Sequence, residues 1–222
     1  MASRSELGRA WNVVHQVEPI SEQPDAEAVA FLEFVGSQSA KGASILDAGC
    51  GRGRNTLHLS RLGYTVHACD LSPVALRIAR ARAVEAGTSV HFQACDLTRL
   101  PYANGFFAVA ICVHVLPYHL RADIVESVRE LWRVLKPNGW LYLDLLACED
   151  AEYGRGQNLE ENTFLDPDGT PLHFSSGQEV RELLAGFGQE QITRLELASS
   201  PDRIRVAWIA WARKQPGAYE GT

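Results

Sequence analysis

The sequence has no apolar run long enough to span a membrane, and its polar start, M-A-S-R-S-E-L-G-R-A-W, lacks the apolar core of a signal peptide. Its five cysteines are odd in number and include no C-x-x-C pair, which argues against a disulfide framework and a zinc site. Positive charge is in the minority, because 21 Lys and Arg against 27 Asp and Glu leave a net charge of −6. We therefore expect a cytoplasmic protein with reduced cysteines, no metal, and neither a membrane nor a nucleic acid as partner.

The sequence does contain short apolar runs that alternate with segments of helical periodicity. These runs are typical of buried strands and fall at residues 43–48, 64–69, 89–94, 106–113 and 140–146. The alternation predicts an α/β fold with a doubly wound, mostly parallel sheet and helices on both faces. Two later runs, at 192–197 and 204–212, have no convincing helix between them and predict an antiparallel C-terminal hairpin. The expected sheet is seven-stranded.

The 222 residues, 46% of them hydrophobic, are enough for one domain with a buried core. Short signals mark its internal boundaries. Ser72 followed by Pro73 predicts a helix start, S-G-Q-E at 176–179 matches a capping box, and K-P-N-G at 136–139 is expected to end a helix. The predicted parts are an N-terminal helical cap (1–40), a cofactor-binding core (41–147), a polar lid or substrate-side insertion (148–175), a C-terminal helix and hairpin (176–214) and a tail (215–222).

The most informative stretch is I-L-D-A-G-C-G-R-G-R-N at residues 45–55, where a buried strand turns into a helix. Glycines at alternate positions let the backbone turn sharply and approach a ligand, and the helix start offers unpaired N–H groups. The spacing G-x-G-x-G, with Asp47 two residues before it, differs from the dinucleotide G-x-G-x-x-G and from a P-loop. The turn therefore predicts a pocket for a nucleotide-like cofactor that has no pyrophosphate.

Other polar residues follow the later strands of the predicted sheet. Asp70 ends the second strand, where its carboxylate could accept both hydroxyls of a ribose, and Asp96-Leu97 follows the third, where a base could bind. The segment C-V-H-V-L-P-Y-H at 112–119 follows the fourth strand, where substrate and cofactor would meet. Each feature has a structural alternative, since Asp70 could cap the helix near Ser72 and Asp96 could close a turn. Their joint occurrence at strand ends favours one binding site.

With these residues in place, the chain resembles the class I S-adenosylmethionine-dependent methyltransferases. D-A-G-C-G-R-G looks like the first motif of that family, and L-W-R-V-L-K-P-N-G-W at 131–140 is similar to its helix–turn–strand signature. Trp11-Asn12, G-Q-N-L-E-E-N-T-F at 156–164 and His173-Phe174 resemble the small-molecule, tellurite-resistance-like branch. The resemblance implies S-adenosyl-L-methionine as cofactor, S-adenosyl-L-homocysteine as product and no metal.

The resemblance also implies roles for individual residues. The family often has two histidines after the fourth strand, where this chain has Pro117 and Tyr118. The candidates for catalysis are His114, His119 and Tyr118, and those for the substrate side are Trp11, His15, Phe164 and His173. Structural roles explain these residues as well: a satisfied histidine, a packed loop, or an ordinary amphipathic helix. The expected cofactor-binding residues are Asp47, Ala48, Gly49, Cys50, Gly51, Gly53, Asn55, Asp70, Leu71, Asp96, Leu97, Cys112 and Val113.

The expected reaction is transfer of a methyl group to an O, N, S or metalloid nucleophile of a small molecule by in-line displacement. Orientation of the two reactants can contribute ~7–11 kcal/mol, and a general base is needed only when the nucleophile must lose a proton. Two alternatives stay open: a noncatalytic module that senses S-adenosylmethionine, and an NAD-dependent oxidoreductase, which the missing G-x-x-G step disfavours. The acceptor atom and the choice between monomer and homodimer are left open.

Overall fold

The computed structural model describes residues 11–16, 23–36, 42–167, 169–200 and 203–215. The first ten residues, which include the polar start considered above, and nearly all of the predicted tail lie outside these ranges. None of the described helices combines the length and the apolar composition needed to cross a membrane.

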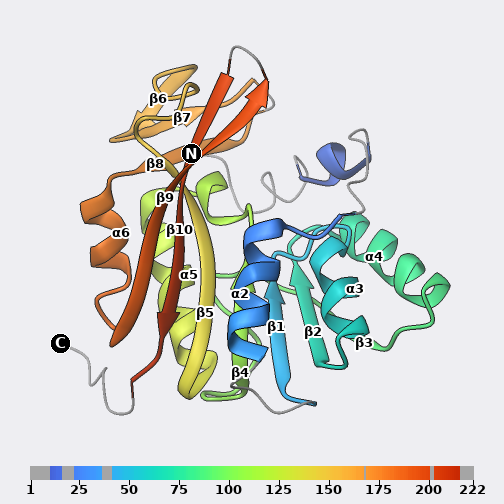
Figure 1. Ribbon diagram of the computed structural model, residues 1–222. Coiled ribbons are helices and arrows are strands. Elements are labelled where there is room, and N and C mark those ends of the chain that lie inside the picture. The colour runs from blue at the N-terminus through green and yellow to red at the C-terminus, as the bar shows by residue number, and fades with distance from the viewer. Residues whose placement is uncertain (1–10, 17–22, 37–41, 168, 201–202, 216–222) are drawn as a thin grey trace.

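A parallel sheet in the order β3-β2-β1-β4-β5 forms the centre of the molecule (Figure 1). Strand β10 pairs antiparallel with β5, and β9 pairs antiparallel with β10, which confirms the C-terminal hairpin. The seven predicted strands are present, but the described sheet has ten strands rather than seven, because three short ones join it beside β5. The seven predicted strands are β1 (Ser44–Ala48), β2 (Thr65–Asp70), β3 (Val90–Ala94), β4 (Phe107–Cys112), β5 (Leu135–Ala147), β9 (Gln189–Ser200) and β10 (Arg203–Arg213).

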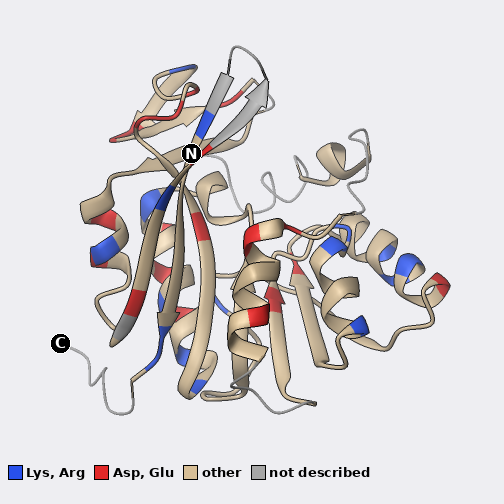
Figure 2. Cartoon of the chain, viewed as in Figure 1, with Lys and Arg blue, Asp and Glu red and all other residues tan. Residues whose placement is uncertain are grey.

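Helices cover both faces of this sheet, as a doubly wound fold requires. On one face lie α2 (Ala26–Gly36), α3 (Arg54–Arg61) and α4 (Pro73–Glu85), and on the other lie α5 (Arg121–Val134) and α6 (Gly177–Leu183). Two predicted helix starts are confirmed, because the hydroxyls of Ser72 and Ser176 accept hydrogen bonds from the backbone N–H groups three residues later. Figure 2 shows that charged residues lie mainly on helices and turns, while the central strands carry few.

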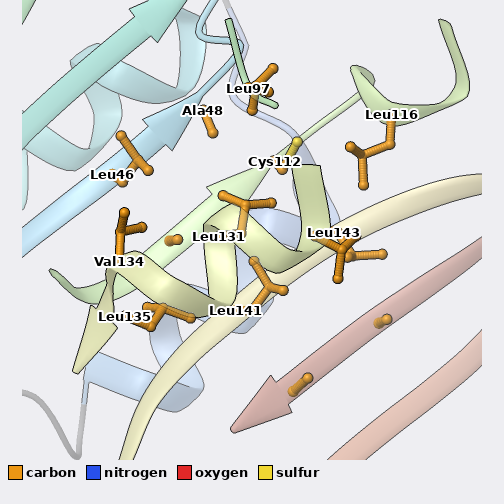
Figure 3. Packing of buried hydrophobic residues seen from close by; sticks show 14 of the residues in the cluster. Leu46, Ala48, Leu97, Cys112, Leu116, Leu131, Val134, Leu135, Leu141 and Leu143 are labelled. Atoms are coloured by element: carbon orange, nitrogen blue, oxygen red, sulfur yellow. The ribbon is translucent and has the colours of Figure 1, made fainter. Parts of the chain in front are cut away.

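The larger core lies between the sheet and α5. Leu131 and Val134 of α5 point toward Leu46, Leu141 and Leu143 of the strands (Figure 3), and all five side chains are completely buried. Burial of one leucine side chain stabilises a fold by about 1.5–3 kcal/mol. This packing therefore fixes the strand ends whose residues form the site below.

Residues 148–175, expected to form a polar lid or substrate-side insertion, contain three strands that the sequence pattern did not predict. This segment forms β6 (Gln157–Glu160), β7 (Thr163–Leu165) and β8 (Pro171–Ser175), which pair antiparallel with one another. Strand β8 also pairs in parallel with the end of β5, where Phe174 lies beside Leu146. The strands are three to five residues long and separated by turns, so they leave no readable alternation of polar and apolar residues.

The K-P-N-G segment follows the end of α5, as expected, but its residues already belong to strand β5. The pairing between β4 and β5 jumps from Phe107 opposite Leu135 to Val109 opposite Trp140, which makes these residues a bulge within β5. Asn138 adopts a positive φ of 65° in this bulge, and its backbone N–H donates to the carbonyl of Lys214.

Candidate functional site

A cavity of about 330 Å³ opens at the carboxyl ends of β1, β2 and β4. The structure brings most of the predicted site residues together in its wall. Those of the predicted cofactor set are Gly49, Cys50, Gly51, Asn55, Asp70, Leu71, Asp96, Leu97 and Val113, and the other predicted ones are Trp11, His15, His114, Tyr118 and His119. Its remaining wall residues, which we did not predict as site residues, are Arg52, Arg54, Arg82 and Val115.

The glycine-rich turn forms the floor of this cavity. Gly49 and Gly51 have φ values of 74° and 51°, and the N–H groups of Gly49 and Cys50 both donate to the carbonyl of Cys69. A Cβ on Gly49 would overlap the side chain of Val115. Only glycine combines that backbone conformation with that close approach, so the turn presents bare backbone to the cavity.

Asp47 lies beneath the turn, outside the wall of the cavity. The hydroxyl of Thr56 donates to Asp47 Oδ2 at 2.5 Å, which ties the first turn of α3 to the end of β1. Burial raises the pKa of Asp47 to about 6, against the lowering effect of the Thr56 hydrogen bond. Ala48, Gly53 and Cys112 of the predicted cofactor set likewise lie outside the wall. A direct contact between these four residues and a cofactor stays a prediction.

The carboxylates of Asp70 and Asp96 lie at the wall of the cavity and are fixed by hydrogen bonds. Asp70 accepts hydrogen bonds from the backbone N–H groups of Gly51 and Ser72, each at 2.8 Å. Its burial raises the pKa, and these two bonds oppose that rise. Asp96 Oδ1 accepts from both the N–H and the hydroxyl of Thr98. Asp96 therefore closes a turn and faces the cavity as well, so its two interpretations do not exclude each other.

His114 lies between two carboxylates. Its Nε2 is 3.1 Å from Asp25 Oδ2, its Nδ1 is 3.4 Å from Asp144 Oδ2, and its φ is 56°. The charge of Asp144 raises the pKa of His114 against the effect of burial. Burial raises the pKa of Asp25, but the hydrogen bond and the charge of His114, with help from Arg54, outweigh it and lower that pKa to about 2. The arrangement favours the imidazolium form, so His114 is a poor general base.

His119 has the opposite character. Its Nδ1 lies 3.0 Å from the carbonyl oxygen of Val115, which assigns the ring proton to Nδ1 and leaves a lone pair on Nε2. Burial lowers the pKa of His119, and the backbone contact opposes this only in part. A neutral imidazole at the wall of the cavity is suited to accept a proton.

The helical segment 11–16 forms a roof over the cavity and lies above the carboxyl ends of the strands in Figure 1. Its Asn12 accepts a hydrogen bond from the hydroxyl of Ser72 at 2.6 Å, which fixes the segment to the start of α4. Trp11 packs edge-on against Tyr118, with ring centroids 5.0 Å apart, and Trp11 and His15 both line the cavity. Contact between these two residues and a substrate stays a prediction.

Phe164 and His173 do not line this cavity. His173 is 1% exposed, with Nδ1 2.7 Å from the hydroxyl of Thr163 and Nε2 3.3 Å from Glu179 Oε2. Phe164 packs beside Phe174 in a separate apolar cluster. Their position points to a role in holding β7, β8 and α6 together, and contact with a substrate stays a prediction.

No local motif indicates the arginines in the wall of the cavity. Arg82 Nη1 donates to the carbonyl of Arg52 at 2.8 Å, and the Arg82 side chain reaches the cavity. Arg54 Nη2 lies 3.7 Å from Asp25 Oδ2. Asp25 and Asp144 were missed because they lie 89 and 30 positions from His114, beyond any local motif. Within the described residues, no group of three or more His, Cys, Asp or Glu could hold a metal ion.

Comparison with known proteins agrees with this geometry. A family described as "Methyltransferase domain" matches residues 45–139. The ubiquinone biosynthesis O-methyltransferase of Xanthomonas euvesicatoria pv. vesicatoria is 32% identical over 197 residues, covering 82% of this chain and 81% of that protein. The chain belongs to the class I S-adenosylmethionine-dependent methyltransferases.

Two further similarities support the family and the fold. The uncharacterized methyltransferase YodH of Bacillus subtilis is 30% identical over 154 residues, covering 69% of this methyltransferase but only 62% of YodH. The crystal structure of Burkholderia thailandensis 1,6-didemethyltoxoflavin-N1-methyltransferase, with bound 1,6-didemethyltoxoflavin and S-adenosylhomocysteine, superimposes with a TM-score of 0.73. It covers 97% of this chain and 92% of its own at 22% identity, which shows a shared fold. Membership of the tellurite-resistance-like branch stays a prediction.

Proposed function

We propose that this methyltransferase transfers the methyl group of S-adenosylmethionine to a hydroxyl oxygen of a small aromatic molecule. The observation that carries the proposal is the single cavity that joins the glycine turn and two fixed carboxylates to a neutral histidine under an aromatic roof. Its volume of about 330 Å³ suits small molecules.

The cofactor side of the cavity fits the parts of S-adenosylmethionine. The carboxylate of Asp70 suits the ribose hydroxyls, and Asp96 beside the apolar Leu97 suits the adenine and its amine. The bare backbone at Gly49 and the guanidinium of Arg54 suit the methionyl part with its carboxylate. When bound, this cofactor supplies a sulfonium-activated methyl group.

We assign the role of general base to His119. Its Nε2 would accept the proton of the acceptor hydroxyl while the oxygen forms its bond to the methyl carbon and the carbon–sulfur bond breaks toward a neutral thioether. A positioned base of this kind accelerates a reaction by about 100- to 10,000-fold. His114 is unsuited to this step because Asp25 and Asp144 stabilise its protonated form.

Two observations support an aromatic acceptor with a hydroxyl group. Trp11 and Tyr118 present ring surfaces to the cavity, and Tyr118 is backed by the apolar cluster of Leu146, Leu172 and Phe174. Rings stack on such surfaces with about 0.5–1.5 kcal/mol beyond the burial of their area. In addition, the similar Xanthomonas protein is a ubiquinone biosynthesis O-methyltransferase.

A labelled-methyl assay tests the proposal, with pooled phenols, thiols, amines, carboxylates and metalloid oxyanions as acceptors. Phenols should take up the label, and His119→Gln should lower kcat by about 100-fold or more and remove the acidic limb of the pH profile. His114→Asn, which changes the neighbouring histidine, should keep that limb. Label only in thiols, amines, carboxylates or oxyanions, or full activity of His119→Gln, would contradict the proposal. Tight cofactor binding without any labelled product would indicate the sensor alternative.

A cytoplasmic location, a monomeric or homodimeric state and the absence of nucleic acid and membrane partners stay predictions.

A further inference from the structure

The loop that carries Asp96 has an unusual need for support. Residues 95–106 connect β3 to β4 without any helix, so their backbone N–H and C=O groups have no regular ladder to pair with. Buried backbone groups without partners are costly, and other parts of the protein must therefore supply partners. Two side chains of α5, Glu130 and Arg133, do so.

The hydrogen bonds from α5 hold three points of the loop. The N–H of Leu100 donates to Glu130 Oε2 at 2.7 Å, and Arg133 Nη2 donates back to the carbonyl of Leu100 at 2.9 Å. Arg133 Nη1 donates to the carbonyl of Tyr102 at 2.7 Å and to Asn104 Oδ1 at 2.8 Å. The guanidinium of Arg133 and the carboxylate of Glu130 thus supply hydrogen-bond partners for backbone groups of the loop that no helix or strand pairs.

Glu130 and Arg133 also fix each other. Arg133 Nε donates to Glu130 Oε1 at 2.6 Å, and Nη2 donates to Oε2 at 2.8 Å, a bidentate pair across one turn of helix. The two side chains are 14% and 29% exposed, so solvent screens them only in part. The planar fork of arginine makes all these bonds at once, which the single ammonium group of lysine does not.

A short hydrogen-bonded turn at residues 96–99 connects Asp96 to Leu100, which α5 holds in place. Thr98 donates to the Asp96 carboxylate, and the N–H of Arg99 donates to the Asp96 carbonyl at 3.0 Å. Leu97 and Leu100 are 5% and 3% exposed and belong to the same apolar cluster as Leu131 of α5, and Leu97 and Leu131 appear in Figure 3. The turn therefore has little freedom to shift independently of α5.

We propose that Glu130 and Arg133 are positioning residues that set the place of Asp96 and thereby the recognition of the adenine amine. The inference rests on the proposed function, since it takes the cavity as the site of S-adenosylmethionine. Neither side chain lines the cavity, so neither is expected to touch the cofactor.

Base discrimination provides the test. Dissociation constants are measured by calorimetry for S-adenosylhomocysteine and for S-inosylhomocysteine, in which an oxo group replaces the adenine amine. The wild-type protein should prefer the adenosyl compound by about tenfold or more, because the analogue has no amine to donate a hydrogen bond to Asp96. In Arg133→Gln and Glu130→Gln the preference should fall below about threefold, and Arg133→Lys provides a milder change that keeps the charge.

The pair Glu126 and Arg129 is the matched control. It lies on the same helix with the same spacing, at 3.3 Å, but both side chains are largely exposed and none of their hydrogen bonds described here reaches the loop. Arg129→Gln should keep the wild-type preference. The inference is overturned if folded Arg133 and Glu130 variants keep the preference, if they lose affinity for both compounds by the same factor, or if the wild type shows no preference. Absence of any binding of S-adenosylhomocysteine to the wild type would instead count against the proposed function.

Discussion

The two sides of the cavity differ in where their residues come from. On the cofactor side, Gly49, Asp70 and Asp96 each lie at or just after the carboxyl end of a strand, so their place in the sequence predicts their place in space. On the substrate side, Trp11 comes from the helical segment 11–16 and Tyr118 from the 3₁₀ helix η1 (Leu116–Tyr118). A parallel sheet therefore lets local motifs predict a cofactor site, whereas the residues above the cavity depend on contacts between segments far apart in the sequence.

The two sides also differ in charge. Figure 2 shows acidic segments at the carboxyl ends of β1 and β2 and at the start of α2, beside the cofactor side. There Asp25 and Asp144 hold His114 as a cation, whereas on the substrate side burial keeps His119 neutral. One histidine therefore serves the structure of the site, and the other is available for chemistry.

The largest expected effect is on the cofactor side. Asp70→Ala should weaken binding of S-adenosylhomocysteine by at least about 100-fold, because hydrogen bonds from ribose hydroxyls to a charged group contribute ~1.5–3 kcal/mol each. Asp70→Asn, which keeps one acceptor oxygen, should lie between this variant and the wild type. Calorimetric titration measures both, and affinity within about threefold of the wild type in a folded Asp70→Ala protein would refute the ribose role.

The second prediction is that a change among strands β6–β8 alters stability but not cofactor affinity. His173→Ala removes the partners of Thr163 and Glu179 in a buried setting and should lower the free energy of unfolding by about 2–4 kcal/mol. Its affinity for S-adenosylhomocysteine should change by less than about threefold, because distant sites act independently. Urea denaturation and calorimetry provide the two values, with the exposed His91→Ala as control. Unchanged stability, or a large loss of cofactor affinity, would break the distinction between the two regions.

The third prediction concerns the glycine turn. Gly49→Ala combines a strained backbone, about 1–2 kcal/mol, with overlap against Val115 and should destabilise the fold by about 2–3 kcal/mol in total. Adding Val115→Ala should relieve the overlap but not the backbone strain, so about half of the loss should return. Denaturant titration of the single and double variants decides this. A double variant no more stable than Gly49→Ala would show that Val115 is not the obstacle.

The smallest expected effect is the pH dependence of the His114 contacts. The pKa of His114 is raised above its ordinary 6.5, so its contribution to stability is complete below pH 6.5 and is lost as the pH rises through the raised value. The pKa of Asp25 is lowered from 3.8 to about 2, so its contribution is present above pH 3.8 and is lost toward pH 2. The His114 side chain is 42% exposed, so screening keeps the effect small.

His114→Asn tests this window, because asparagine tolerates the positive φ at this position. The variant should lose less stability than the wild type between pH 6.5 and pH 9, as measured by urea denaturation at several pH values. An identical slope in both proteins would mean that Asp144 and Asp25 do not hold His114 as a cation against the opposing charge of Arg54.

Sequence reasoning reached the parallel sheet and most of the cofactor side because both depend on short segments. Gly49 and Asp70 could be placed at the cavity because each lies at the end of a predicted strand. The three strands of residues 148–175 were missed since their turns hide the alternation, and His173 was expected near the substrate although its partners place it among buried groups. The partners of His114 and the support of Asp96 by Arg133 lie 30 or more positions away, where no local pattern reports them.

The most direct test of the central assignment is ligand-induced stabilisation of the wild-type protein. A ligand that binds only the folded state stabilises it by RT ln(1 + L/Kd), where L is the ligand concentration, so the melting temperature rises with ligand concentration. The account predicts that Tm rises with increasing S-adenosylhomocysteine and does not respond to NAD at the same concentrations. Stabilisation by NAD without any effect of S-adenosylhomocysteine would contradict it.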